Sequence, residues 1–125
     1  MDEKFENLPD MYNPIVREMI LKTKELLQKN IPGIQEIIDE KARIIAYGFG
    51  PKYSDYVCTI ILSKNGVKLG FYRGGELPEK NKLLEGKGKV HKYVQINSDV
   101  LGSKALKDLI KSAYSAYKKR KSQQP

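Results

Sequence analysis

The sequence predicts an α+β fold: an antiparallel sheet with N- and C-terminal helices packed on one of its faces. Amphipathic stretches with helical periodicity lie toward both ends of the 125-residue chain, and β-branched and aromatic runs occupy its middle. The dipeptide Asn65-Gly66 favours a tight hairpin between two of those runs. Two amphipathic helices most simply cover one face of the sheet that such strands form.

The N-terminal part carries clear helix signals. We expect the first helix to begin at Asn13-Pro14, because asparagine is a preferred cap and proline suits the first helical position. It should end near Asn30, since Pro32 disfavours helical backbone in the residue before it. Isoleucines with helical spacing then predict a short second helix within residues 33–40.

The middle of the chain predicts strands, over residues 42–47, 56–63, 67–73 and 92–97. Asn65 and Gly66 both tolerate the positive φ that a two-residue type I′ turn requires, so the second and third strands should pair as a hairpin. A long connection over residues 74–91 should contain one helical turn near residues 81–84. The last helix should begin at Ser98 or Ser103.

Alternation along these strands sorts their side chains between two faces of the sheet. The residues predicted to face the helices are Cys58, Ile60, Leu62, Leu69, Phe71, Val94 and Ile96. Those predicted to face the other way are Thr59, Ser63, Lys68, Tyr72, Tyr93 and Gln95.

Length and composition indicate one domain over residues 13–121, with a flexible segment over residues 1–12 and a short tail over 122–125. No apolar run approaches a membrane span, and the acidic N-terminus lacks the hydrophobic core of an export signal. Cys58 is the only cysteine, which excludes an internal disulfide and fits a reducing cytoplasm. Its apolar neighbours predict a core residue, not a reactive thiol.

Charge is distributed unevenly along the chain. Residues 1–79 hold 11 Lys/Arg against 12 Asp/Glu, a net charge of −1, whereas residues 80–125 hold 12 against 3, a net charge of +9. This asymmetry can mark a surface for anionic partners. It can equally reflect a solvated, lysine-coated helix with a basic tail.

The basic, aromatic part of the chain supplies a candidate site for an anion. Its predicted ligand-binding residues are Tyr72, Arg73, Lys87, Lys89, Lys92 and Tyr93. Backbone amides and ammonium groups in Gly86–Lys89 could cradle an anion, although the spacing is not that of a P-loop and a solvated turn is the simpler reading. Arg73 could grip a carboxylate or phosphate, or pair with a neighbouring glutamate. The tyrosines could stack nucleobases or pair across strands.

Catalytic and metal-binding patterns are weak. His91 is the only histidine, and no nucleophile–base or acid pair can be placed by spacing, so we expect no catalysis and no cofactor. Glu36, Asp39 and Glu40 form an acidic group that could bind iron, although ordinary solubilising charge explains it as well.

Three segments resemble the YdhG-like family of domains of unknown function: Leu69-Gly-Phe-Tyr-Arg-Gly-Gly-Glu-Leu77, Leu83-Leu-Glu-Gly-Lys-Gly88 and Lys92-Tyr-Val-Gln-Ile96. The resemblance runs from about Asn13 to Tyr117. The family usually carries an Arg-His pair where Lys92 and Tyr93 stand here. The resemblance implies a sandwich similar to frataxin, and some members are proposed intracellular iron chaperones.

These observations favour a small cytoplasmic binding module for an anionic small ligand or a protein partner. One alternative, implied by the resemblance, is an iron chaperone that uses the acidic residues. A second is an RNA-binding accessory protein, for which we expect weak, non-specific binding through lysine–phosphate contacts.

Overall fold

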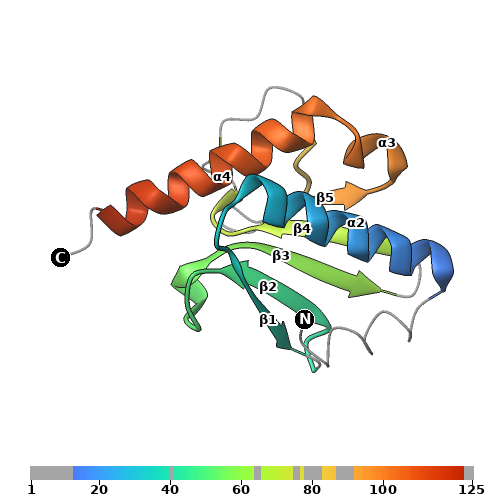
Figure 1. Ribbon diagram of the computed structural model, residues 1–125, viewed down its shortest axis with the longest axis horizontal. Helices are drawn as coiled ribbons and strands as arrows, with labels where there is room; N and C mark the ends of the chain where they lie inside the picture. The colour runs from blue at the N-terminus through green and yellow to red at the C-terminus, as the bar shows by residue number, and fades with distance from the viewer. Residues whose placement is uncertain are drawn as a thin grey trace.

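The structure is a computed structural model that describes residues 13–39, 41–63, 66–74, 77, 83–86 and 92–122. Its elements follow in the order α2 (Pro14–Asn30), β1 (Gln35–Asp39), β2 (Ile44–Gly48), the 3-10 turn η2 (Tyr53–Asp55), β3 (Tyr56–Ser63), β4 (Gly66–Phe71), β5 (Lys92–Ile96), α3 (Ser98–Leu101) and α4 (Lys104–Ser122). The strands form one five-stranded antiparallel sheet in the order β1-β2-β3-β4-β5. Helices α2 and α4 cover one face of it, which confirms the predicted fold class (Figure 1).

The first helix has the predicted ends. The Asn13 side chain accepts a hydrogen bond from the Val16 amide at 2.9 Å, and Pro14 occupies the first helical position. The helix ends at Asn30, and the amide of Ile31 donates to the carbonyl of Leu27 at 2.9 Å. Sequence signals alone therefore specify where α2 begins and ends.

The predicted short helix within residues 33–40 is wrong, because residues 35–39 form β1. The isoleucine spacing there fits a helix, yet β-branched residues also fit a strand, and short apolar runs do not separate the two. Pairing with β2 decides the outcome, with Ile37 opposite Ala46 and Ile38 opposite Ile45. Gly33, at φ +79°, turns the chain out of α2 into this strand.

The predicted hairpin between β3 and β4 is present, but its turn lies one residue earlier than expected. Ser63 pairs with Gly66, so Gly66 is the first residue of β4 and is not among the glycines with positive φ. Residues 64 and 65 join the strands and lie outside the described part of the chain. The expectation that Gly66 needs positive φ is therefore wrong.

The core lies between the sheet and the two long helices. All seven strand residues predicted to face the helices are buried, none exposing more than 4% of its surface. Buried residues of α2 and α4 pack against them, among them Ile20, Leu27, Leu106 and Ile110. On the opposite face, Lys68, Tyr72, Tyr93 and Gln95 are half-buried or exposed, as predicted.

Both predicted starts of the last helical region are used. Asn97 caps α3 by accepting from the Val100 amide at 2.9 Å, and the Ser103 hydroxyl accepts from the Leu106 amide at the start of α4. Helix α4 then runs through Ser122, one residue beyond the predicted domain limit. Leu83 and Leu84 are not helical, and the rest of the turn predicted near residues 81–84 lies outside the described residues.

None of the helices in the described residues is both long and apolar enough to cross a membrane.

Candidate functional site

The face of the sheet opposite the helices carries a hollow of about 210 Å³. We call it the sheet-face hollow. It is lined by residues of β2, β3, β4 and β5 and by the residue that follows β4. These residues are Ile44, Tyr56, Thr59, Ile61, Gly70, Phe71, Tyr72, Lys92 and Tyr93. Most of this lining is apolar or aromatic, so the hollow offers ring-sized contact area with polar groups only at its margin.

Gly70 is what keeps the sheet-face hollow open. It lies inside β4, opposite Thr59 of β3 and Tyr93 of β5, where most strands carry a side chain. A Cβ atom there would come within 3.3 Å of Ile61 Cδ1 and project into the space the hollow occupies. Glycine inside a strand weakens it and often marks a place where another group approaches the backbone closely.

Two cations lie against tyrosines of this site. The Lys68 Nζ atom is 4.5 Å from the centre of the Tyr93 ring, and the Arg120 guanidinium is 4.6 Å from the centre of the Tyr72 ring. Positive charge held over an aromatic face is favourable, and it keeps both cations close to the hollow that the two tyrosines line.

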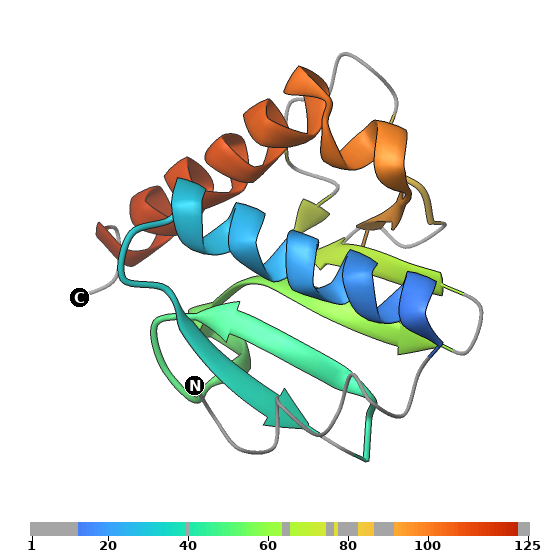
Figure 2. The same ribbon diagram turned by 45° about the vertical axis from the view of Figure 1, so that its right-hand side comes forward.

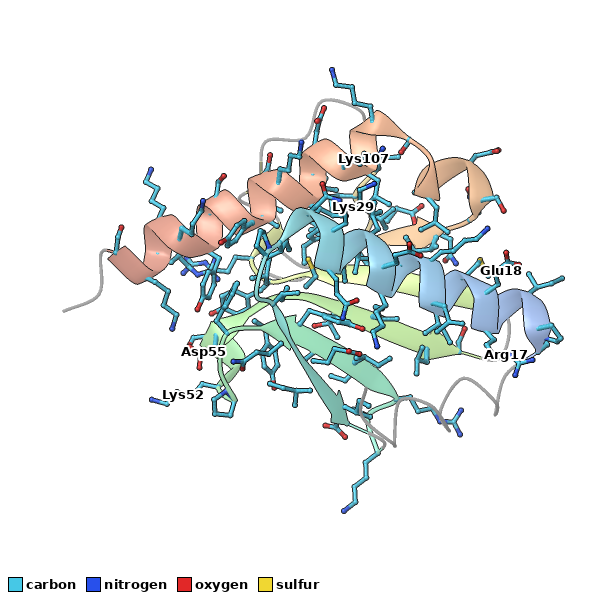
Figure 3. The ribbon with its side chains drawn as sticks, viewed as in Figure 1. Arg17, Glu18, Lys29, Lys52, Asp55 and Lys107 are labelled. Atoms are coloured by element: carbon cyan, nitrogen blue, oxygen red, sulfur yellow. The ribbon has the colours of Figure 1, made fainter. Side chains whose placement is uncertain are left out.

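The C-terminal end of α4 is fastened to the start of β3, which positions Arg120. Lys121 forms an ion pair with Asp55 at 2.5 Å, and Figure 3 shows Asp55 in the segment just before β3, near the C-terminal end of α4. The hydrogen bond from Lys121 holds the pKa of the Asp55 carboxyl below its usual value. Arg120 also donates to the carbonyl of Tyr56 at 3.5 Å. Two contacts therefore hold this helix end beside the Tyr72 edge of the hollow.

The structure brings together three of the six predicted ligand residues: Tyr72, Lys92 and Tyr93 line the same hollow. The Lys92 ammonium donates to the carbonyl of Gly86, which has φ +115°. Arg73 is exposed, adopts φ +54° and does not line the hollow. Lys87 and Lys89 lie outside the described residues, as does His91.

The acidic residues predicted for iron are separated along β1. The Glu36 carboxylate faces Lys24 at 2.8 Å and accepts from the Tyr47 hydroxyl at 3.1 Å, whereas Asp39 accepts from the Ala42 amide at 3.0 Å. Residues three apart in a strand point to opposite faces. Glu40 lies outside the described residues, among which no group of three or more His, Cys, Asp or Glu side chains could hold a metal ion.

Two buried groups on the helix side have raised pKa values. Burial, and then the negative charge of Glu36, raises the pKa of the Tyr47 hydroxyl well above its usual value. Burial alone raises the pKa of the Cys58 thiol. Cys58 is a free cysteine in the core, as predicted. Its raised pKa favours the thiol, whereas nucleophilic chemistry needs the thiolate.

Several residues of the hollow were not predicted as ligands. Ile61 lies on the same face as Thr59 by simple alternation, so the strand prediction already contained it, and Gly70 interrupts an otherwise regular strand pattern. The position of Arg120 over Tyr72 could not be found this way. That contact joins residues far apart in sequence and depends on how α4 crosses the sheet.

No family model matches the chain, and no curated protein or solved structure matches it either. The resemblance to the YdhG-like family stays a prediction.

Proposed function

We propose that this protein is a small binding module that holds a planar, anionic small molecule in the sheet-face hollow. One observation carries the proposal: tyrosines surround a glycine-floored hollow on the sheet face that none of the described helices covers, with two cations over the tyrosine rings at its margin. A tyrosine-lined surface favours a flat ring, and the cations favour a negative group attached to that ring.

The size of the hollow limits the ligand. Small-molecule sites commonly measure about 300–1,000 Å³. At about 210 Å³ the sheet-face hollow is below that range, so it suits a single ring system and not an extended cofactor. The floor, formed by Ile44, Ile61 and Gly70, offers apolar contact to the ring.

The charges favour a carboxylate or phosphate on that ring. Arg120 has a planar fork that matches two oxygens of such a group, and Lys68 supplies a compact second charge on the Tyr93 side. No acidic side chain lines the hollow among the described residues. A ring with its negative group directed toward Arg120 would therefore meet attraction without an acidic side chain in the lining. On the other side, Glu85 lies next to Tyr93, to which it is joined by two backbone hydrogen bonds.

The family resemblance, a cytoplasmic location and the absence of catalysis belong to the same proposal. Cys58 is unpaired and buried, which fits a reducing compartment. The described residues give no specific support to iron carriage, because Glu36 is already engaged by Lys24 and Tyr47.

The test is a titration with benzoate and phenyl phosphate, followed by amide chemical shifts. We expect shifts at residues 59–61, 70–72 and 92–93, and little response to inorganic phosphate, which has the charge without the ring. Gly70→Val should abolish these shifts by filling the hollow, because valine suits a strand and its Cβ projects into that space.

Gly66→Val is the matched control. Gly66 lies on the same strand and the same face, but it does not line the hollow, and its added Cβ meets only the Gln95 side-chain amide at 3.2 Å. This variant should bind as the unmodified protein does. Equal loss in both variants, or equal shifts with inorganic phosphate, would refute binding in the hollow.

A further inference from the structure

A second concave surface lies on the helical side of the molecule, away from the sheet-face hollow. It is a cleft of about 600 Å³ between α2, α3 and α4, which we call the helix cleft. Helices α2 and α4 come together near the C-terminal end of α2 and diverge toward α3 (Figure 2). Its principal lining residues are Lys22, Leu26, Lys29, Leu101, Lys107 and Lys111.

The helix cleft is strongly positive. Among the described residues that line it, four are lysines and only Glu25 is acidic, a net charge of +3. All four lysines are exposed, and Lys29 of α2 and Lys107 of α4 lie on facing sides of the space between the two helices (Figure 3). The lysines therefore present their charge from both walls of the cleft.

Two of these lysines have an ordinary explanation within their own helix. Lys22 pairs with Glu18 one turn earlier, at 2.9 Å. Lys29 lies in the last turn of α2, where a cation interacts favourably with the helix dipole. Neither residue requires a partner to account for its position.

Lys107 has no such explanation, whereas Lys111 lies three residues after Asp108, a spacing that favours opposite charges. Lys107 lies in the first turn of α4, which contains no acidic residue, so its charge opposes the helix dipole. Lys111 follows at i+4, a spacing at which like charges repel. Departures from such local preferences are common at functional sites. Lys107, whose charge is unfavourable for α4, lines the cleft together with Lys111.

The residues of the helix cleft suit a ligand with several carboxylates better than a compact phosphate. Leu26 and Leu101 are half-buried there, and they offer aliphatic contact between the charged walls. Compact phosphate sites typically use arginine forks or converging backbone amides. The cleft instead has separate, flexible lysines on helix surfaces and no arginine among its described residues. Lysines that are spread along both walls, beside an aliphatic floor, suit a ligand that carries several carboxylates and also has an apolar face.

We propose that the helix cleft is a docking site for an acidic amphipathic helix of a partner protein. Its aliphatic side chains pack on Leu26 and Leu101, and its glutamates and aspartates face the lysines of α2 and α4. An apolar face laid in a groove between helices is a recurrent mode of peptide recognition, and the charges set the orientation of the bound helix.

The test uses a synthetic helical peptide with leucines on one face and glutamates on the other. A scrambled peptide of the same composition is its control. We expect the amphipathic peptide to bind, as followed by fluorescence anisotropy, and to shift amides in residues 22–30 and 101–111. Affinity should fall as salt rises, because exposed charges are screened.

Lys107→Glu/Lys111→Glu is the informative variant. It should weaken peptide binding at least about tenfold by opposing the carboxylates of the peptide. The double variant should melt at about the same temperature as the unmodified protein, because glutamate in the first turn suits the α4 dipole, whereas the two glutamates repel each other as the two lysines did. Weaker binding at unchanged or higher melting temperature separates a docking role from a structural one.

Lys41→Glu/Lys119→Glu makes the same change in net charge at exposed positions outside the cleft. It should weaken binding by less than about threefold, as expected for distant, screened charges. Equal loss in both double variants, equal binding of the scrambled peptide, or displacement of the peptide by an equimolar amount of tripolyphosphate or oligouridylate would overturn the proposal. Self-association of the protein that masks the same amides would also overturn it.

Discussion

The two faces of the sheet differ in how far their side chains are buried. On the helix side, neighbouring strands contribute aliphatic and aromatic side chains that are almost fully enclosed, such as Ile60, Leu69 and Val94. On the other side, Ile61, Tyr72 and Tyr93 remain partly exposed around a hollow. The covered face supplies most of the folding free energy, because stabilisation follows the apolar area removed from water. The open face contributes less to stability and can therefore serve binding.

Adjacent residues of β3 provide the largest contrast. Ile60 is fully buried and Ile61 points to the open face. We expect Ile60→Ala to lower the free energy of unfolding by about 2–5 kcal/mol, through lost burial and an unfilled cavity. Ile61→Ala, which removes the same atoms from a half-exposed site, should cost about 1 kcal/mol. Urea unfolding of the two variants measures both values, and similar losses would contradict the division between the faces.

Ion pairs of α2 show the same contrast within the helix layer. Lys24 and Glu36 are 2.8 Å apart with side chains 8% and 15% exposed, whereas Lys22 and Glu18 are 2.9 Å apart and more than half exposed. Lys24→Met should cost about 2–3 kcal/mol, because Glu36 then keeps its charge in a largely enclosed place. Lys22→Met should cost less than about 0.5 kcal/mol.

A second substitution tests the reason for that loss. Adding Glu36→Gln to Lys24→Met removes the unpaired charge but leaves an oxygen that can accept from Tyr47. The double variant should recover most of the lost stability in urea unfolding. A double variant no more stable than Lys24→Met would show that Lys24 acts through packing of its aliphatic stem instead.

Much of the structure of the covered face could be predicted from the sequence. The start and end of α2 follow from Asn13, Pro14 and Pro32, and β3 has its predicted limits, because caps, proline and β-branched runs act locally. The prediction failed at β1, where isoleucine spacing fits both periodicities and only pairing with β2 decides. Local signals do not contain that information.

The candidate site was less accessible to sequence reasoning. Tyr72 and Tyr93 were assigned to one face by alternation, and they do share the hollow. The hollow itself depends on the missing side chain at Gly70, and the cation beside it depends on the path of α4, which brings Arg120 over Tyr72. The helix cleft likewise depends on the crossing of α2 and α4, so its lysines appear in sequence only as ordinary helix-surface charge.

Alkaline pH should lower the free energy of unfolding through two groups on the covered face. The pKa values of Tyr47 and Cys58 are raised in the folded protein above their ordinary values of 10.0 and 9.0. The unfolded chain then loses protons that the folded chain keeps, so stability is complete below about pH 8 and falls as pH rises through 9 and 10. Urea unfolding at pH 8 and pH 10 should differ by about 1–2 kcal/mol from these two groups.

Substitutions identify the groups behind this loss. Tyr47→Phe and Cys58→Ala should each make stability less dependent on pH between 8 and 10, whatever they cost at neutral pH. An unaltered dependence of stability on pH in the Tyr47→Phe, Cys58→Ala double variant would mean that these two groups do not cause the loss at alkaline pH.

The smallest effect is expected for nucleic acid on the open face. The sheet-face hollow accepts one ring, and successive bases of a single strand need successive stacking surfaces, so a short oligouridylate should bind weakly through lysine–phosphate contacts. Its affinity should fall linearly in log[salt], with a slope near −0.7 for each phosphate contact. Tyr72→Ala and Tyr93→Ala should change that affinity less than about twofold, whereas stacked bases would cost about 1–3 kcal/mol each. Fluorescence anisotropy with the labelled oligonucleotide measures this. A large loss on either substitution, together with micromolar binding at physiological salt, would make the open face an RNA-binding surface and would replace the single-ring ligand proposed for it.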